Sequence, residues 1–395
     1  MLPTERSTGR VCQQTRCRLP PTIVGRIPRD TQKIFGSALL LCFVLCAVSG
    51  GCRDRNSPTT TAADKAAMRQ TLSWDGRTMG TTYRVVVWAP ASDKGSREAL
   101  NQSVLTRAVE KRLARINQCM STYQPDSELS QFNATKSRQW FSVSPETAHV
   151  VKAAKGYHQA TNGALDVTIG PLMELWGFDP TPRVDQREPT HEQLQEVLKR
   201  VGSQHLKVRI EGDGQAALQK MVEGLHIDVS ALAKGYAVDQ IVALLAQSGA
   251  AGGLVEIGGE VRTWGLRADG RMWRIGIENP LVADRRLAEI ITLDNASLAT
   301  SGDYRNFRSF PSGSVSHLID PSTGVAQPTG PRSVSVCAKT CIESDALATA
   351  LFLMGQKRGL AWSEDHGVAA MFLTIENGKL RTVFSSHFAP YFEPQ

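Results

Sequence analysis

Cysteine is scarce in the part of the chain that can form a globular body. Five of the eight cysteines lie in the first 52 residues, which leaves Cys119, Cys337 and Cys341. This trio is not a disulfide framework, and no CxxC pair or His/Cys spacing indicates a zinc site. Cys337 and Cys341 either form one disulfide or are small buried residues, and the sequence leaves both interpretations open.

A surplus of positive charge is also missing outside the N-terminal segment. The formal net charge is +7, but residues 1–33 hold seven Lys/Arg and two acidic residues and so supply +5 of it. The rest of the chain is nearly neutral and has no basic footprint for a polyanion. We therefore expect no nucleic-acid partner.

The apolar run near the N-terminus is too short for a comfortable membrane span. It covers Ile34–Val48, whereas a spanning helix needs about 20 residues. Basic residues before it and small residues after it are typical of a secretory signal, so we predict export. Cys52 follows Ser49, Gly50 and Gly51 as the lipidated cysteine does in bacterial lipoprotein signals. A plain cleaved signal and an uncleaved anchor are the alternatives.

The sequence predicts three segments. Residues 1–52 form the basic leader with its signal, and the polar, small residues 53–72 form a tether. Residues 73–395 contain no repeat and no linker, and the 41% hydrophobic content of the chain is enough to bury a sizeable core. We expect one compact domain there.

Helix and strand signals alternate irregularly along this domain. Residues 81–89 alternate as a strand, and 97–120 predict a long amphipathic helix with Leu100, Val104, Ala108, Leu113 and Ile116 at near-helical spacing. Ser144 caps a further helix, and Thr190 with Gln193 forms a capping-box pattern. Short strands dominate 205–340, a helix from Ser230 interrupts them, and strands near 367–375 and 379–387 close the chain. The absence of a regular βαβ rhythm predicts an α+β fold.

Nucleotide-binding loops of the common types are absent, since no GK[ST] follows a glycine-rich loop and no GxGxxG follows a strand. Polar residues instead occur between the elements. Asp166 lies in a glycine-containing loop, Asp228 precedes a helix that carries Lys234, and His317 lies next to a strand end. Asp345 and Thr349 lie four apart on one face of an apolar helix, where they cap and decorate it or hold a cation.

Taken in order, these stretches resemble the ApbE family of FAD:protein FMN transferases from bacterial envelopes, over about Thr78 to Gly355. Two departures occur: Leu165 replaces an aromatic residue, and Ser322 replaces a common Arg or Gln. The matching stretches are MGTTY (79–83), MSTYQPDSELSQFN (120–133), TNGALDVTIGPLMELWGF (161–178), IDVSALAKGYAVD (227–239), EIGGEV (256–261), WRIGIENP (273–280), ATSGDY (299–304), HLIDPSTG (317–324) and SDALATALFLMG (344–355).

The resemblance implies a single α+β domain with mainly antiparallel strands and a T-fold-like core, and it implies the site residues. The FAD site would comprise Met79, Tyr123, Ala164, Leu165, Asp166, Asp228 and Lys234, with His317 and Leu318 beside the flavin and its phosphates. The metal would be held by the side chains of Asp345 and Thr349 and the carbonyls of Ala231 and Ala348. Such oxygen ligands suit Mg²⁺.

Each implied role has a purely structural alternative. Tyr123 alone would be a surface aromatic, Asp166 would cap a turn and Asp228 would cap the helix from Ser230. Lys234 would be a solvated helix residue and His317 a hydrogen-bonded structural histidine.

The resemblance further implies the reaction. A Ser or Thr hydroxyl of a partner protein would attack the phosphorus of the FMN half of FAD, and AMP would leave. His317 is the candidate base, with Asp228 in reserve. The expected partner is a membrane redox-pump subunit, and the expected location is the periplasmic side of the cell membrane. FAD hydrolysis to FMN and AMP, and FAD binding without turnover, are the alternatives.

Overall fold

The structure is a computed structural model that describes residues 69–90, 100–179, 187–212, 214–280, 286–303, 306–328, 332–377 and 379–393. These residues belong to one unit, 58–395. The predicted leader at 1–52, including Cys52, lies outside the described residues. The predicted tether extends too far, because strand β1 begins at Arg69 and so includes the last four tether residues.

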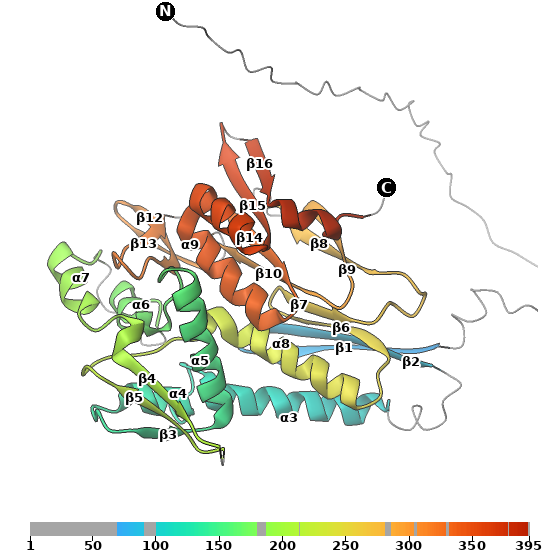
Figure 1. The fold of residues 1–395 in the computed structure, drawn as a ribbon, viewed down its shortest axis with the longest axis horizontal. Coiled ribbons are helices and arrows are strands. Elements are labelled where there is room, and N and C mark those ends of the chain that lie inside the picture. The colour runs from blue at the N-terminus through green and yellow to red at the C-terminus, as the bar shows by residue number, and fades with distance from the viewer. Residues whose placement is uncertain are drawn as a thin grey trace, which may run out of the picture. The chain divides into compact units, whose positions relative to one another are not determined.

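An eight-stranded antiparallel sheet runs through the fold (Figure 1). Strand β2 (Thr81–Pro90) buries an apolar face formed by Tyr83, Val85 and Val87. The pairing of β7 with β10 covers only two residue pairs, Ser297 with Arg262 and Leu298 with Val261. In sheet order the strands are β1 (Arg69–Thr78), β2 (Thr81–Pro90), β6 (Gly252–Ile257), β7 (Glu260–Trp264), β10 (Ser297–Gly302), β14 (Ser333–Ala338), β15 (Ala369–Glu376) and β16 (Lys379–Phe384).

Two long helices pack on this sheet next to each other. Helix α8 (Ser230–Gln247) contacts β6 and β7, and α9 (Cys341–His366) contacts β10 and β14. They approach closely at Gly235, where an added Cβ would lie 2.2 Å from the carbonyl oxygen of Cys341. No larger residue fits at this position without separating the helices.

A buried carboxylate joins the two helices. Asp239 of α8 accepts hydrogen bonds from the N–H groups of Cys341 (2.8 Å, to Oδ1) and Ile342 (3.0 Å, to Oδ2), which are among the donors that a helix leaves unpaired at its start. Arg262 of β7 pairs with Oδ1 at 2.5 Å. We call Asp239, Arg262 and these two N–H groups the Asp239 cluster. It fixes the start of α9 against α8.

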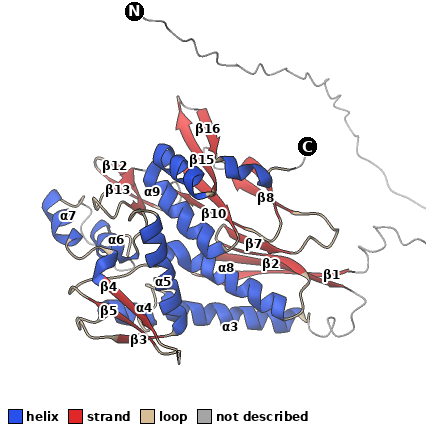
Figure 2. Cartoon of the chain, in the orientation of Figure 1, coloured by secondary structure: helices blue, strands red, loops and turns tan. Residues whose placement is uncertain are grey.

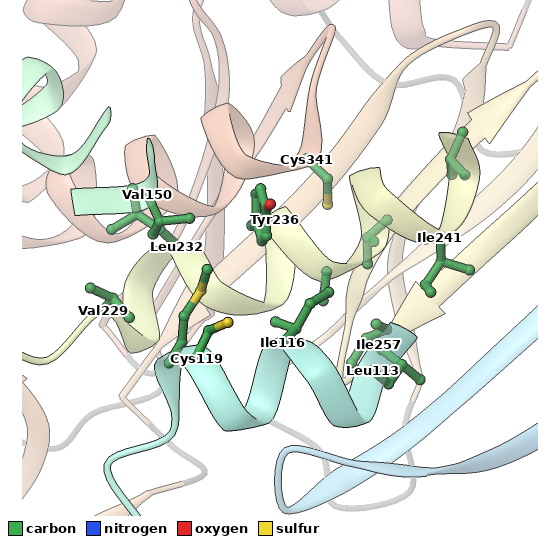
Figure 3. Close-up of a cluster of buried hydrophobic side chains, with 14 of the residues drawn as sticks. Leu113, Ile116, Cys119, Val150, Val229, Leu232, Tyr236, Ile241, Ile257 and Cys341 are labelled. Atoms are coloured by element: carbon green, nitrogen blue, oxygen red, sulfur yellow. The ribbon is translucent and has the colours of Figure 1, made fainter. Parts of the chain in front are cut away.

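Helix α3 (Gln102–Met120) completes this helical layer and packs on α8. Figure 3 shows Ile116 of α3 on the side of that helix toward Tyr236 of α8, and Leu113 next to Ile257 of β6. The predicted helix began too early, because Asn101 caps it. The predicted apolar stripe was partly wrong: Val104 is 50% exposed, and the buried positions continue from Ile116 back through Leu113 to Val109 and Leu105, at spacings of three and four.

The remaining elements surround this core. Figure 2 shows the helices in blue and the strands in red. Ser144 caps α5 and Thr190 forms the predicted capping box. Cys119, Cys337 and Cys341 are free and buried. Among the described residues, no helix has the length and hydropathy to cross a membrane. These elements are α4 (Glu128–Ala134), β3 (Phe141–Val143), α5 (Pro145–Ala160), η1 (Val167–Ile169), α6 (Gly170–Trp176), α7 (His191–Leu198), η2 (Ser203–His205), β4 (Leu206–Ile210), β5 (Ala216–Lys220), β8 (Trp273–Glu278), β9 (Leu287–Leu293), β11 (Phe307–Phe310), β12 (Gly313–Ile319), β13 (Ala326–Pro328) and η3 (Ser386–Tyr391).

Candidate functional site

Two adjoining cavities form one cleft at the start of α8. The inner chamber has a volume of about 650 Å³ and the outer chamber about 660 Å³, each within the range of small-molecule sites. Six residues line both of them and mark the place where the two chambers meet: Met173, Asp228, Ser230, Lys234, Asn306 and His317.

The structure brings all but one of the predicted site residues to this cleft. Asp228, Lys234 and His317 line both chambers, whereas Ala348 lines neither, and its side chain is buried. Met79 and Tyr123 line the outer chamber only. Those that line only the inner chamber are Ala164, Leu165, Asp166, Ala231, Leu318, Asp345 and Thr349.

A group of three charged side chains, which we call the Lys234 cluster, forms one wall of the inner chamber. Lys234 Nζ lies 3.4 Å from Glu260 Oε1 and 3.8 Å from Asp345 Oδ1. Asp345 Oδ2 accepts a hydrogen bond from Gly235 N–H at 2.9 Å. Glu260 Oε2 is buried and has no hydrogen-bond partner among the described residues. The cluster thus contains two buried carboxylates and one ammonium.

The surroundings shift the pKa values of all three groups. Burial raises the pKa of Glu260 to about 8, although Lys234 opposes the rise. Burial also raises the pKa of Asp345, again against the effect of Lys234. For Lys234, burial favours the neutral form, but the two carboxylates outweigh it and raise the pKa. Lys234 therefore stays charged, and the second carboxylate has no counter-ion of its own.

Oxygen atoms suited to a hard cation lie beside this cluster. Thr349 is one turn after Asp345 on α9, and its Oγ1 lies 3.0 Å from Ser301 Oγ. Ala231 is in the first turn of α8, and the N–H that a regular helix directs to its carbonyl, that of Gly235, also bonds Asp345. In the described part of the chain, no group of three or more His, Cys, Asp or Glu could hold a metal. A cation here would need ligands from water or substrate.

His317, on β12, is oriented by a main-chain carbonyl. Its Nδ1 lies 3.1 Å from the carbonyl oxygen of Asn306, so Nδ1 carries the hydrogen and Nε2 has the free lone pair. Burial lowers the pKa of His317, which keeps the ring neutral near pH 7. A neutral ring with an unprotonated Nε2, placed where the chambers meet, is suited to accept a proton.

The two other predicted aspartates make local hydrogen bonds. Asp228 Oδ1 accepts from Ser230 N–H at 2.7 Å, a local bond two residues along the chain. It does not cap α8, because the N-cap residue is Val229 and no described side chain caps this helix. Asp166 Oδ1 accepts from Thr168 N–H at 2.8 Å, and its Oδ2 accepts from Ser203 N–H at 3.0 Å. The structural alternative thus describes the Asp166 side chain, and the contact of this residue with FAD stays a prediction.

The outer chamber has an open side formed by residues of two turns. Tyr123 is 68% exposed, so its ring face is accessible. Met79 lies in the tight turn between β1 and β2 with φ of 49°, in the left-handed region that residues other than glycine seldom adopt. An aromatic ring and a thioether side chain thus line the outer chamber.

Comparison with known proteins identifies the family. The sequence model of the ApbE family matches residues 79–372, more than half of the chain. The chain belongs to the ApbE family. It is 41% identical over 319 residues to the FAD:protein FMN transferase of Vibrio cholerae, covering 80% of this chain and 91% of that protein. It is 32% identical over 341 residues to the enzyme of that name from Escherichia coli K12, covering 86% and 93%.

Solved structures of ApbE proteins share the fold. The flavin transferase ApbE from Vibrio cholerae superposes with a TM-score of 0.70 at 38% identity, covering 82% of this chain and all of that one. The apo flavinyl transferase ApbE of Pseudomonas stutzeri gives a TM-score of 0.72 at 33% identity, covering 83% and 98%. The family resemblance and the α+β fold class predicted from the sequence are confirmed.

Two residues that organise this ApbE-family cleft were not predicted. Glu260 follows the Gly258–Gly259 turn, in a stretch that entered the prediction only as a match to the family. A charged residue directly after the glycine turn was the available signal. Asn306 orients His317 through its main-chain carbonyl, and a pattern of side chains in the sequence cannot predict a main-chain contact of this kind.

Proposed function

We propose that this protein transfers the FMN half of FAD to a Ser or Thr hydroxyl of a partner protein and releases AMP. The observation that carries the proposal is His317, with its free Nε2 between an inner chamber lined by charged residues and an open outer chamber. The relatives named FAD:protein FMN transferase support the same reaction. The open chamber gives the partner's hydroxyl a route to the base.

The residues of the cleft have separable roles in this reaction. The hydroxyl oxygen forms a bond to the phosphorus of the FMN phosphate, and the bond from that phosphorus to the oxygen bridging to AMP breaks. His317 Nε2 takes the hydroxyl proton, which typically contributes about 10²–10⁴-fold to a rate. Lys234 offsets the charge of the phosphates. Asp228, which lies just before α8 and lines both chambers, is the reserve base.

A divalent cation fits the inner chamber. Asp345 and Thr349 side chains and the carbonyls of Ala231 and Ala348 would hold it, and the nearby Glu260 oxygen, which has no partner among the described residues, supports a chamber with bonding capacity left for a ligand. Hard oxygen donors in small number suit Mg²⁺. When bound, Mg²⁺ would neutralise phosphate charge and orient the leaving group.

The mass of the acceptor tests the function. The purified full-length protein is incubated with FAD, Mg²⁺ and a bacterial redox-pump subunit that carries a Ser/Thr acceptor motif. We expect the acceptor to gain FMN less one water, and AMP to appear in equal amount. The matched control is the acceptor with its Ser or Thr replaced by Ala, which should gain nothing. FMN and AMP released without any acceptor mass change would instead identify a FAD pyrophosphatase, and FAD binding without products would identify a flavin-binding protein.

We also propose that the protein is exported and lipid-anchored at Cys52 on the periplasmic side of the cell membrane. The support is the basic leader, the apolar run Ile34–Val48 and the small residues before Cys52. A labelled fatty acid should appear on the wild-type protein and not on Cys52→Ala. Absence of label from the wild type would leave secretion without lipidation.

A further inference from the structure

We propose that Lys234 is a resident counter-ion of the cation site and that Glu260 is the carboxylate to which its ammonium shifts when a divalent cation binds Asp345. This inference rests on the metal site in the proposed function. It assigns Glu260 a positioning role, exerted through Lys234. The apo arrangement is then a competition between one ammonium and one metal for the same aspartate.

The first support is the position of the ammonium between two carboxylates from different elements. Lys234 is on α8, Glu260 begins β7 and Asp345 is on α9. Nζ is 3.8 Å from Asp345 Oδ1 and 3.4 Å from Glu260 Oε1. A small movement of the Lys234 side chain is therefore enough to take its ammonium from one carboxylate to the other. The side chain of Lys234 is 29% exposed, so packing does not hold it rigidly, and its four-carbon stem is flexible.

The second support is the unequal bonding of the two carboxylates. Asp345 Oδ2 is engaged by Gly235 N–H, so Oδ1 is the oxygen left for either the ammonium or a cation. Glu260 Oε2 is buried without a partner in the described part of the chain. A buried acceptor without a donor is costly. An ammonium that moves toward Glu260 supplies the missing donor.

The physical reason for the shift is charge repulsion. A divalent cation on Asp345 Oδ1 and an ammonium less than 4 Å from the same oxygen repel strongly in a buried site. Without Glu260, the Lys234 ammonium would have to move into water or stay beside Asp345 and repel the metal. With Glu260, the ammonium can move away from Asp345 and donate a hydrogen bond to the unpartnered Glu260 oxygen. Removal of Lys234 should therefore tighten metal binding. Glu260→Gln, which cannot ionise to receive the ammonium, should weaken it.

Simple long-range electrostatics predicts the same direction of change in metal affinity for each of the two variants. Single variants therefore do not distinguish it from the proposed movement of the ammonium. A double-mutant cycle does. We would titrate the purified full-length protein and its variants with Mn²⁺, which binds to similar oxygen ligands, in the absence of FAD and at neutral pH. Electron paramagnetic resonance of free Mn²⁺ reports the Kd without any catalytic assay. Circular dichroism melting confirms that each variant is folded.

We expect Lys234→Met to lower the Kd about tenfold and Glu260→Gln to raise it about tenfold, the scale seen for outer partners of metal ligands. In the Lys234→Met background, Glu260→Gln should change the Kd less than about twofold. Glu260→Asp, the second variant if Glu260→Gln does not fold, should also weaken binding only while Lys234 is present. An equal weakening by the Glu260 variants in both backgrounds would overturn the proposal.

Two controls separate the inference from its premise. Glu256→Gln removes the same charge from the same chamber, but Glu256 Oε1 accepts from Gly259 N–H and is not a partner of the Lys234 ammonium. It should change the Kd less than about twofold, and a tenfold weakening would indicate bulk electrostatics and overturn the inference. Asp345→Asn should raise the Kd for Mn²⁺ about 100-fold. Unchanged Mn²⁺ affinity in Asp345→Asn would contradict the proposed metal site itself.

Discussion

Two charged clusters lie along the same pair of helices, and they differ in how completely their carboxylate oxygens are hydrogen-bonded. In the Asp239 cluster, both carboxylate oxygens accept main-chain N–H groups of α9, and Arg262 supplies the counter-charge. In the Lys234 cluster, one ammonium faces two carboxylates, and Glu260 Oε2 has no partner among the described residues. The chemical components are similar, but the atoms left without a partner among the described residues differ: a carboxylate oxygen of Glu260 in the second cluster and the Nε donor of Arg262 in the first. Only the second cluster therefore has an acceptor left for a cation or a donor.

This difference in hydrogen bonding distinguishes a carboxylate that stabilises the fold from one that can bind a ligand. A buried carboxylate that is fully bonded stabilises one arrangement, and it loses that bonding if anything else binds. A buried carboxylate that is incompletely bonded costs stability until a ligand or a moving side chain satisfies it. We infer that Asp239 stabilises the start of α9 against α8, whereas the Lys234 cluster is the part that responds to a ligand.

Substitution of His317 should have the largest effect on activity. Its Nδ1 bonds the Asn306 carbonyl, and its Nε2 keeps a lone pair that can accept a proton. His317→Gln keeps an amide that can bond the Asn306 carbonyl but removes the basic nitrogen. We expect FMN transfer to fall about 10²–10⁴-fold, the usual contribution of a general base. Thermal melting should change little, since the retained contact is the structural one. A rate within threefold of wild type would remove His317 from the chemistry.

The pH dependence of the wild type sharpens this assignment. Burial lowers the pKa of His317 below its ordinary value near 6.5. A base works only when unprotonated, so the rate should fall as the pH drops through this lowered pKa, with the acid midpoint below about 6.5. A kcat/KM profile from pH 5 to 8 measures it, and a midpoint above about 7 would contradict the assignment.

Asp345→Asn tests the incompletely bonded cluster directly. Asn keeps the shape and one acceptor oxygen for Gly235 N–H but removes the negative charge. We expect a melting temperature near wild type without metal, and FMN transfer that needs about 100-fold more Mg²⁺, the scale of a severe loss at a metal site. Titration of the transfer rate with Mg²⁺ measures the shift. Wild-type rate and wild-type Mg²⁺ dependence would falsify the metal assignment.

Asp239→Ala should have the opposite profile. It removes the acceptor for two α9 N–H groups and leaves Arg262 without its partner. We expect a loss of about 3 kcal/mol in unfolding free energy, at the low end for a broken buried pair, because 25% of the Arg262 side chain is exposed and water can solvate it. Below its melting temperature, the variant should keep the Mg²⁺ midpoint of the wild type within threefold. Denaturant unfolding and the Mg²⁺ titration together check both halves of the comparison.

Local signals in the sequence were enough to predict much of the fold. The capping box at Thr190 and Gln193, the cap at Ser144 and the helix start at Ser230 each depend on residues within a few positions. The stripe on α3 was placed less well, since Val104 and Leu105 are both apolar and only the tertiary partner decides which faces inward. The short pairing of β7 with β10 depends on contacts between distant segments and has no local signal.

The candidate site shows the same division. Family motifs led to Asp345, Lys234 and His317, and the structure brings them to one cleft. The bonding state of each group was not predictable, because it depends on distant partners. Glu260 and Lys234 are 26 positions apart, yet their side chains are 3.4 Å apart. Only the folded chain shows that one of the Glu260 oxygens lacks a partner.

Tyr123→Ala should give the smallest effect, because this residue belongs to neither cluster. The ring is 68% exposed in the outer chamber, so its removal should leave the melting temperature unchanged. If the ring stacks on the isoalloxazine of FAD, the lost contact is about 0.5–1.5 kcal/mol, and the Kd for FAD should rise about tenfold at most. Tyr123→Phe keeps the ring and should bind as the wild type does. Calorimetry with FAD measures all three proteins, and a Kd unchanged in Tyr123→Ala would show that the flavin binds elsewhere in the cleft.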